Sequence, residues 1–278
     1  ITGMAETGLV WDERCHRAVT DFIPWYDLQA EGELKTIRAV ECEAQRFVKG
    51  GTRLSSKCNL AKLLHLRGQG LDLKNKTWLF ASSFMAKQLC GTIACEPTVA
   101  SRSYCFDQAE NQWDTAWMER FDLPETVFPP LVPSGAGIGR LKPEHQLEPW
   151  LHGGTEVVLA GHDHVVAAMG IGAVDPGQMV NSMGTAEALL GVMDQLQLPV
   201  QCSALGFSFG PHIIPGKKYW MGGISASGAS VEWFRSLTGL DQDSYQEIQN
   251  LLAPLEPGPT GILYFPYLSG AGAPWPDG

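Results

Sequence analysis

Residues 161–170 read Gly-His-Asp-His-Val-Val-Ala-Ala-Met-Gly and directly follow the Val- and Leu-rich stretch Thr155–Ala160. We expect Thr155–Ala160 to be a buried strand and His162–Gly172 to be a helix of small residues. Asp163 then stands at the carboxyl end of a strand, where α/β folds place their functional sites. A carboxylate there can cap the helix that follows, take part in chemistry, or do both. Asp163 is therefore the first candidate functional residue.

The run His162-Asp163-His164 also raises the question of a metal site. Adjacent side chains rarely converge on one ion, and the segment lacks both an H-x-x-x-H spacing and a third ligand nearby. A metal hydrolase built on these three residues is a minor alternative. We assign no metal-binding residue.

Two further segments have the composition of a phosphate or nucleotide site. In Asn181–Glu187 a strand ends at Gly184-Thr185, a tight turn whose backbone N–H groups and hydroxyl suit phosphate oxygens. In Gly222–Trp233 small residues open a helix with an aromatic face, which indicates close packing on a sheet or a flat wall for a nucleotide. Neither segment matches the G-x-G-x-x-G or P-loop pattern, so standard dinucleotide and Walker sites are disfavoured.

The first residues pair carboxylates with an aromatic ring. Glu6 follows a strand-like start in Gly3–Thr7, and Trp25-Tyr26-Asp27 lies a short way along the chain. A carboxylate accepts hydrogen bonds from polyol hydroxyls, and an aromatic ring offers a stacking surface to a sugar. These features are compatible with a sugar site, although each also occurs without one.

Hydrophobic periodicity predicts alternating strands and helices, which favours α/β or α+β layering. The remaining expected strands are two within Ile1–Val10, then Phe22–Tyr26, the extended Val99–Phe106, Gln178–Met183, Glu187–Met193 and Ile262–Phe265. The remaining expected helices are Ala30–Phe47, Asn59–Leu66, Thr77–Leu89, Asp114–Phe121, Pro143–Leu151, Ser225–Leu237 and Ser244–Leu252, and Pro124–Gly139 is expected to be a loop. The expected domain seam lies near Gly170–Gly172.

Composition excludes several classes of protein. The 278 residues are 44% hydrophobic and 18% charged, with a formal net charge of −10, so a dedicated nucleic-acid binder is disfavoured. No apolar run approaches the about 20 residues of a membrane helix, and no signal peptide is recognisable. The seven cysteines show no C-x-x-C spacing, so we expect buried free thiols in a reducing cytoplasm.

Taken in order, these segments resemble the FGGY family of carbohydrate kinases. Further similarity lies in Ser55-Ser56-Lys57, Thr98–Asp107 with Trp113, Ser134–Gly139 and Pro266–Pro276. The resemblance implies an α/β, actin-like (ribonuclease-H-like) fold of two domains, 1–172 and 173–278, on either side of a cleft. It also implies transfer of the γ-phosphoryl group of ATP, with Mg²⁺, to a hydroxyl of a sugar or polyol. A homodimer is a further expectation.

The resemblance assigns roles residue by residue. Asp163 falls on the catalytic aspartate. The positions expected to contact the sugar are Glu6, Trp25 and Asp27, and those expected to contact ATP are Gly184, Thr185, Gly228 and Glu232.

The sequence also departs from the family pattern. Ala5 stands where glycerol kinases carry Arg, Met4-Ala5-Glu6 replaces the Gln-Met-His of xylulokinases, and Gln29 stands at another Arg position. Glycerol and xylulose are therefore not predicted as substrates. Family members have a phosphate-binding strand before Ile1 and an adenosine-binding segment after Gly278, so the fold is expected to be incomplete at both ends. The alternative function is an inactive sugar-binding or scaffolding relic.

Overall fold

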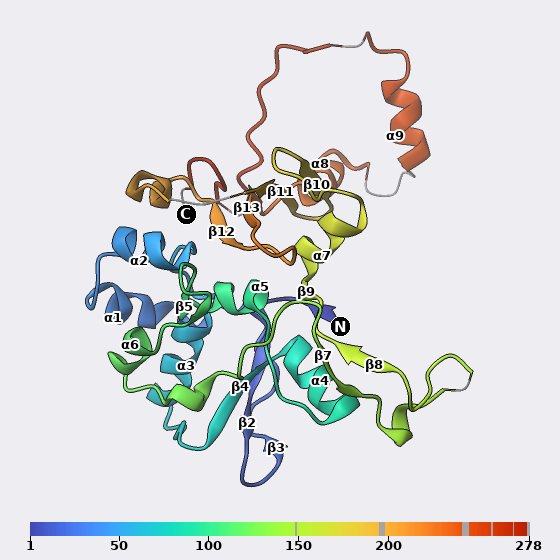
Figure 1. Cartoon of the computed structure of the whole chain (residues 1–278). Helices are drawn as coiled ribbons and strands as arrows, with labels where there is room; N and C mark the ends of the chain where they lie inside the picture. Colours follow the sequence, from blue (N-terminus) through green and yellow to red (C-terminus); the bar gives the residue numbers. More distant parts are fainter. Residues whose placement is uncertain (148, 195–197, 241–244, 257, 269, 277–278) are drawn as a thin grey trace.

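The chain folds into two lobes (Figure 1). The structure is a computed structural model that describes residues 1–147, 149–194, 198–240, 245–256, 258–268 and 270–276. The first lobe contains the elements from β1 to β9. Helix α7 leads from it into the second lobe, which is built on a four-stranded sheet.

The first lobe is assembled from short elements. Its strands are β1 (Thr2–Gly3), β2 (Gly8–Asp12), β3 (Arg17–Ala18), β4 (Lys76–Phe80), β5 (Phe106–Asp107), β6 (Gln112–Trp113), β7 (Gly137–Arg140), β8 (Glu156–Val158) and β9 (Gly161–His162). Its α-helices are α1 (Leu34–Arg38), α2 (Glu43–Gly50), α3 (Asn59–Gly68), α4 (Ala81–Cys90), α5 (Pro97–Ala100) and α6 (Thr115–Glu119). Its 3₁₀ turns are η1 (Gln29–Glu33), η2 (Ser101–Ser103), η3 (Glu125–Val127) and η4 (Pro143–His145).

The core of the first lobe lies between the β3-β2-β4 sheet and helix α3. Strands β2 and β4 are antiparallel, and Val10, Trp78 and Phe80 are fully buried. Leu60 and Leu63 of α3 pack into the same cluster. Burial of large apolar side chains is the main stabilising contribution to such a layer.

A separate parallel pairing joins β1 to β9. Thr2 pairs with Gly161 and Gly3 pairs with His162. The hydroxyl of Thr2 also donates to the Gly161 carbonyl at 2.8 Å. The pairing therefore brings the segment that follows β1 next to the segment that follows β9.

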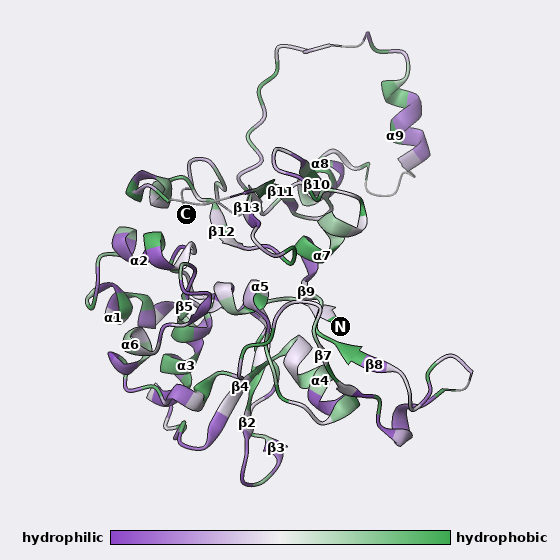
Figure 2. Ribbon diagram, viewed as in Figure 1, coloured by the Kyte–Doolittle hydropathy of each residue, from purple (hydrophilic) through white to green (hydrophobic). Residues whose placement is uncertain are grey.

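The second lobe is a sheet of order β10-β11-β13-β12, with every neighbouring pair antiparallel. Its elements are α7 (Asp163–Gly170), β10 (Met179–Met183), β11 (Glu187–Met193), η5 (Val200–Ala204), β12 (Ser208–Pro211), β13 (Lys218–Ile224), α8 (Gly228–Thr238) and α9 (Tyr245–Leu252). Val165 and Ala168 of α7 pack against Leu190 and Tyr219 of the sheet. Helix α9 stands apart, carries hydrophilic and hydrophobic residues, and buries none (Figures 1 and 2).

Several predicted elements are confirmed, whereas in the first lobe two are partly wrong in type and one predicted helix is interrupted. The predicted helix Thr77–Leu89 begins instead as strand β4 and becomes α4 at Ala81, because Trp78-Leu79-Phe80 pairs with β2. The predicted extended segment Val99–Phe106 begins with helical turns. Glu96 caps these turns through the N–H groups of Thr98 and Val99. The predicted helix Ala30–Phe47 is broken into η1, α1 and α2.

Other expectations fail at their edges. Only Ile23 of the expected strand Phe22–Tyr26 forms a bridge, and among the described residues of Pro143–Leu151 only the η4 turn is helical. Gly137–Arg140 forms a strand within the expected loop, whereas Ile262–Phe265 does not form one. The helix expected from Ser225 begins at Gly228, and Ser244 lies outside the described residues. All cysteines are free, but Cys15 and Cys42 are exposed rather than buried.

The two lobes also meet away from α7, at the end of α2. The Phe209 N–H of β12 donates to the Gly51 carbonyl at 2.8 Å, and the Gln108 amide donates to the Phe209 carbonyl at 3.0 Å. The rings of Phe47 and Phe209 meet edge to face. Gly51 has φ +69° and ends α2 in the left-handed conformation. The chain can thus turn there while lying against β12.

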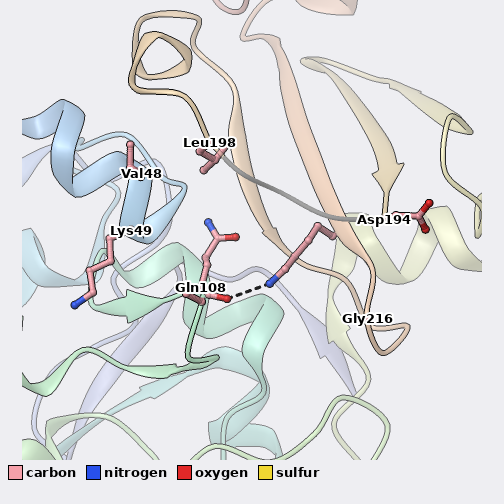
Figure 3. A pocket seen from close by; sticks show the side chains of 8 residues that line it. Val48, Lys49, Gln108, Asp194, Leu198 and Gly216 are labelled. Carbon is pink, nitrogen blue, oxygen red and sulfur yellow. Dashed lines mark hydrogen bonds between the residues drawn. The ribbon is translucent and has the colours of Figure 1, made fainter.

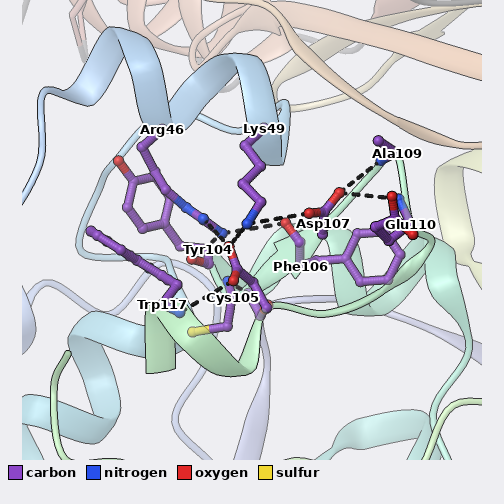
Figure 4. A network of polar contacts seen from close by, with 11 residues as sticks. Arg46, Lys49, Tyr104, Cys105, Phe106, Asp107, Ala109, Glu110 and Trp117 are labelled. Carbon is purple, nitrogen blue, oxygen red and sulfur yellow. Dashed lines mark hydrogen bonds and ion pairs between the residues drawn. The ribbon is translucent and has the colours of Figure 1, made fainter. Parts of the chain in front are cut away.

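A buried ionic network supports this end of the first lobe (Figure 4). Arg46 of α2 is 2% exposed and is paired with Asp114, which also contacts the Lys49 ammonium at 2.7 Å. The Arg46 guanidinium also donates to the carbonyls of Tyr104 and Phe106 and lies over the Trp117 ring. It thereby fixes the backbone where Tyr104, a non-glycine residue, has φ +70°.

We expect Asp114→Asn to lower the free energy of unfolding by about 3–5 kcal/mol, because it leaves the buried Arg46 charge without its carboxylate. Urea denaturation followed by circular dichroism measures the change. The matched control is Glu43→Gln, which removes a pair with Arg38 that is 53% and 27% exposed and should cost less than about 1 kcal/mol. Equal effects of the two substitutions would contradict the burial described for Arg46.

A second prediction concerns the junction of the lobes. Gly51 and Gly239 end α2 and α8 with nearly the same φ, +69° and +72°. A Cβ at Gly51 would overlap Gln108 and the Phe209 carbonyl, whereas at Gly239 it would meet nothing within 4 Å. We expect Gly239→Ala to cost about 1–2 kcal/mol through backbone strain alone, and Gly51→Ala to cost clearly more. Thermal unfolding of both variants tests the difference, and equal losses would argue against the close contact.

Candidate active site

A cavity of about 410 Å³ lies between the lobes. Its first-lobe wall carries the residues that follow β1 and β9 together with η2, and its second-lobe wall carries the β10–β11 turn and the end of β13. The polar and charged side chains that line it are Glu6, Lys57, Arg102, His162, Asp163, His164, Ser182, Glu187, Ser208 and Ser225. Of the residues predicted from sequence, Glu6, Trp25, Asp163 and Gly184 are among the lining residues.

Glu6 is held in the cavity wall by Arg102. The Nε and Nη2 groups of Arg102 each donate to Oε1 of Glu6 at 2.8 Å, and Glu6 is 8% exposed. Burial alone would raise the pKa of Glu6, but Arg102 and His162 outweigh it and hold that pKa below its usual value. The pair therefore presents a charged acceptor and a charged donor side by side, an arrangement that suits neighbouring hydroxyl groups.

Helix α3 anchors both segments that carry the predicted sugar contacts. The Lys62 ammonium donates to the carbonyls of Glu6 at 2.8 Å and Pro24 at 2.9 Å, and burial lowers the pKa of Lys62 to about 8. The backbone N–H of Trp25 donates to the hydroxyl of Thr7 at 3.0 Å. Together these bonds place the Trp25 loop beside Glu6.

The Trp25 ring lines the cavity, and Lys57 lies 4.9 Å from its centroid. Asp27 does not line the cavity. Its carboxylate accepts hydrogen bonds from the backbone and side chain of Gln29 instead. The structure thus separates Trp25 from Asp27 within the predicted Trp-x-Asp motif.

Asp163 is the first residue of α7 and points a partly exposed carboxylate into the cavity. The alternative that Asp163 is the N-cap of the helix does not hold, because the N-cap position is His162; Oδ1 of Asp163 accepts the N–H of His164 at 2.8 Å. His162 is buried beside it, with Nε2 at 3.3 Å from Oδ1 of Asp163. Across the described ranges of the chain, no cluster of three or more His, Cys, Asp or Glu side chains is arranged to hold a metal ion.

The Gly184-Thr185 turn is docked on the start of α8. The carbonyl of Gly184 accepts the Gly228 N–H at 2.9 Å, and the carbonyl of Thr185 accepts from Ser227 and Ala229. The first N–H groups of α8 are therefore engaged by the turn. A Cβ at Gly228 would lie 2.7 Å from the Gly184 carbonyl oxygen, so only glycine allows this contact.

Thr185 and Glu232 lie outside the residues that line the cavity. Glu232 is on α8, where it pairs with Arg235 at 2.9 Å and accepts a hydrogen bond from the Tyr245 hydroxyl of α9. These contacts hold the exposed end of Glu232 between two helices.

Sequence reasoning missed Arg102 and Lys62 as site residues. Arg102 lies within the family-like segment Thr98–Asp107, but its contact with Glu6 joins positions 96 residues apart. Lys62 lies on α3, whose sequence has no unusual feature. Only the burial of Lys62 and its hydrogen bonds to two carbonyls show that it anchors the segments beside the cavity. No local pattern marks either residue.

A second cavity of about 290 Å³ opens at the α2 side of the junction (Figure 3). Lys49, Gln108, Asp194 and Lys218 contribute to its lining, and the Lys218 ammonium donates to the Gln108 carbonyl at 3.1 Å. Its lining differs from that of the larger cavity, because it includes none of the site residues predicted from the sequence.

In the part of the chain that the structure describes, no helix is long and apolar enough to span a membrane.

The chain is similar to several known proteins. A model of the N-terminal domain of the FGGY family of carbohydrate kinases matches residues 1–170. The xylulose kinase of Staphylococcus xylosus is 24% identical over 279 aligned residues, which cover 97% of this chain and 56% of that protein. The chain spans about half the length of the curated relatives it matches.

Solved structures share the fold. The gluconate kinase of Lactobacillus acidophilus matches with a TM-score of 0.86 at 19% identity, over 99% of this chain and 56% of that one. The glycerol kinase of Plasmodium falciparum, solved with ADP, matches with a TM-score of 0.79 at 20% identity, over 92% of this chain and 51% of that one. The predicted incomplete actin-like sugar kinase fold is confirmed. With its family match extending over more than half of its length, this chain belongs to the FGGY family of carbohydrate kinases.

Proposed function

We propose that the protein transfers the γ-phosphoryl group of ATP, with Mg²⁺, to a hydroxyl group of a sugar or polyol. One observation carries the proposal: Asp163, the Glu6–Arg102 pair and the Gly184 turn line a single cavity between the lobes. A base, a hydroxyl-binding pair and a turn suited to phosphate are the groups that such a transfer needs within reach of one another. The family match supports the same reaction class.

Asp163 is the proposed base. Phosphoryl transfer passes through a loose transition state, so most of the catalysis is positioning and charge stabilisation. An aspartate carboxylate is a weak base towards an alcohol, but it can orient the hydroxyl and accept its proton late, when bond formation has made that proton acidic. The partly exposed carboxylate of Asp163 faces the cavity in which this hydroxyl would lie.

The sugar is proposed to lie against the first-lobe wall. Glu6 accepts and Arg102 donates hydrogen bonds to adjacent hydroxyls, and the Trp25 ring provides a flat surface for the carbon skeleton. Asp27 remains a proposed sugar contact from the resemblance alone, because its carboxylate is engaged by Gln29.

The second-lobe wall fits the phosphate end of ATP. Bound MgATP would supply the phosphoryl group and the cation that neutralises its charge. The wall carries the hydroxyls of Ser182, Ser208 and Ser225, and Gly184 lines it without a side chain that could obstruct a phosphate. Gly184, Thr185 and Gly228 are proposed to shape this wall, and Glu232 to lie near the nucleotide. The domain division at Gly172, the cytoplasmic location and the homodimer remain predictions.

The proposal predicts that Asp163→Asn lowers the sugar-dependent kcat by about 10²–10⁴-fold while the protein stays folded. A coupled assay of ADP release, run with a panel of sugars and polyols and MgATP, measures the effect. Asp175→Asn is the matched control, since the Asp175 side chain is 68% exposed, does not line the cavity and pairs with Lys217. Loss of less than about threefold in the Asp163 variant would contradict the assignment. Sugar binding without ADP release in the unmodified protein would instead favour the inactive sugar-binding alternative.

Gly228→Ala should weaken the use of ATP more than the use of the sugar. The added Cβ would push the Gly184 carbonyl away and shift the turn, so the KM for ATP should rise about tenfold or more. The KM for the sugar should change little. Gly239→Ala, at the other end of α8, provides the control. An unchanged KM for ATP would separate the turn from the nucleotide.

A further inference from the structure

His162 is a buried histidine in the wall of the larger cavity, directly before the proposed base. It ends β9, and its backbone N–H donates to the hydroxyl of Thr98 at 2.7 Å. The residue is only 4% exposed. The β1–β9 pairing and the Thr98 bond fix its backbone, so its imidazole has a defined place relative to Asp163.

The imidazole and a backbone amide share one oxygen of the Asp163 carboxylate. Nε2 of His162 lies 3.3 Å from Oδ1, and the same oxygen accepts the His164 N–H at 2.8 Å. Oδ2 has no donor among the described residues. One carboxylate oxygen therefore accepts the His164 N–H and lies close to the imidazole, and the other is left for a substrate hydroxyl.

His162 is neutral at pH 7. Burial lowers the pKa of His162 to about 4, although the charges of Glu6 and Asp163 favour its protonated form. Arg102 and His164 lower the pKa further. A neutral imidazole carries one ring proton, and a carboxylate can only accept. A hydrogen bond from the imidazole to Asp163 would therefore require the tautomer with its proton on Nε2.

This arrangement is costly for folding. With the proton on Nε2, Nδ1 is a buried acceptor, and it has no hydrogen-bond partner within the described parts of the chain. An unpaired buried polar atom is destabilising, and groups kept in such surroundings gather at functional sites. A small apolar residue would fill the end of β9 at lower cost.

We propose that His162 is a positioning residue, which donates from Nε2 to Oδ1 of Asp163 and so turns Oδ2 towards the hydroxyl to be phosphorylated. The inference rests on the proposed function, because it assigns a partner to the proposed base. The 3.3 Å separation is expected to shorten when substrate fills the cavity, as contacts at catalytic groups often do.

Nitrogen NMR of the histidine rings in the intact protein tests the contact independently of activity. The His162 signals are assigned by their absence in His162→Gln. We expect the Nε2-protonated neutral form at pH 7, and loss of that tautomer preference in Asp163→Ala. A ring protonated on Nδ1, or on both nitrogens at pH 7, would overturn the proposal.

Two substitutions separate positioning from packing. The amide nitrogen of Gln reaches about as far as Nε2 of histidine, whereas that of Asn matches Nδ1 and falls short of Asp163. His162→Asn should lower kcat by about 10–100-fold with little change in the KM for the sugar, and His162→Gln should restore most of the loss. Equal losses in both variants, or none in either, would overturn the positioning role.

The two proposals fail in different ways. If the unmodified protein releases no ADP with any sugar or polyol, the proposed function fails and the tautomer measurement alone decides whether His162 holds Asp163. If the unmodified protein is active and Asp163→Asn is not, but the Asn and Gln variants of His162 behave alike, only the role of His162 fails.

Discussion

The parallel pairing of β1 with β9 is the constraint on which the candidate site depends. It joins Thr2 to Gly161, positions 159 residues apart, through two strands of only two residues each. Glu6 follows one strand and Asp163 follows the other, so the pairing brings the carboxylate proposed to bind the sugar and the proposed base to one wall. Because α7 begins at Asp163 and packs on the second-lobe sheet, the same point also fixes where the opposite wall stands.

The candidate site contains a pair of charged side chains, Glu6 and Arg102, whose burial costs free energy. Taking Glu6 and Arg102 out of water costs free energy that their attraction repays only with good geometry, so such a pair contributes little net stability. Because the pair lies in a cavity wall, its position favours a role in ligand recognition over a role in the stability of the fold. The Arg46 guanidinium donates hydrogen bonds to the carbonyls of Tyr104 and Phe106, and these bonds fix the turn that carries Arg102. The buried network around Arg46 does not line the larger cavity, but it supports the Glu6–Arg102 pair that does.

Two of the failed sequence expectations have different physical causes. Thr77–Leu89 has helical spacing, yet its first residues pair with β2, because a sheet partner outweighs a local preference. Val99–Phe106 reads as extended, yet the buried Glu96 carboxylate caps a helical turn there. Gln178–Met183 and Glu187–Met193 are confirmed because a hairpin depends mainly on neighbours in sequence. The first failure thus came from a strand partner far along the chain, and the second from a cap only two to three residues away.

The sequence by itself determined the family, the fold class and the position of Asp163 at the end of a strand, because these depend on ordered short motifs and local periodicity. It also singled out Glu6, Trp25 and Gly184, which line one cavity. Only the tertiary structure decided that Arg102 pairs with Glu6, that Lys62 holds the carbonyls of Glu6 and Pro24, and that the buried His162 ring stands beside Asp163. Pairing and protonation depend on burial and on distances between segments far apart in the chain, and neither quantity is written in local sequence.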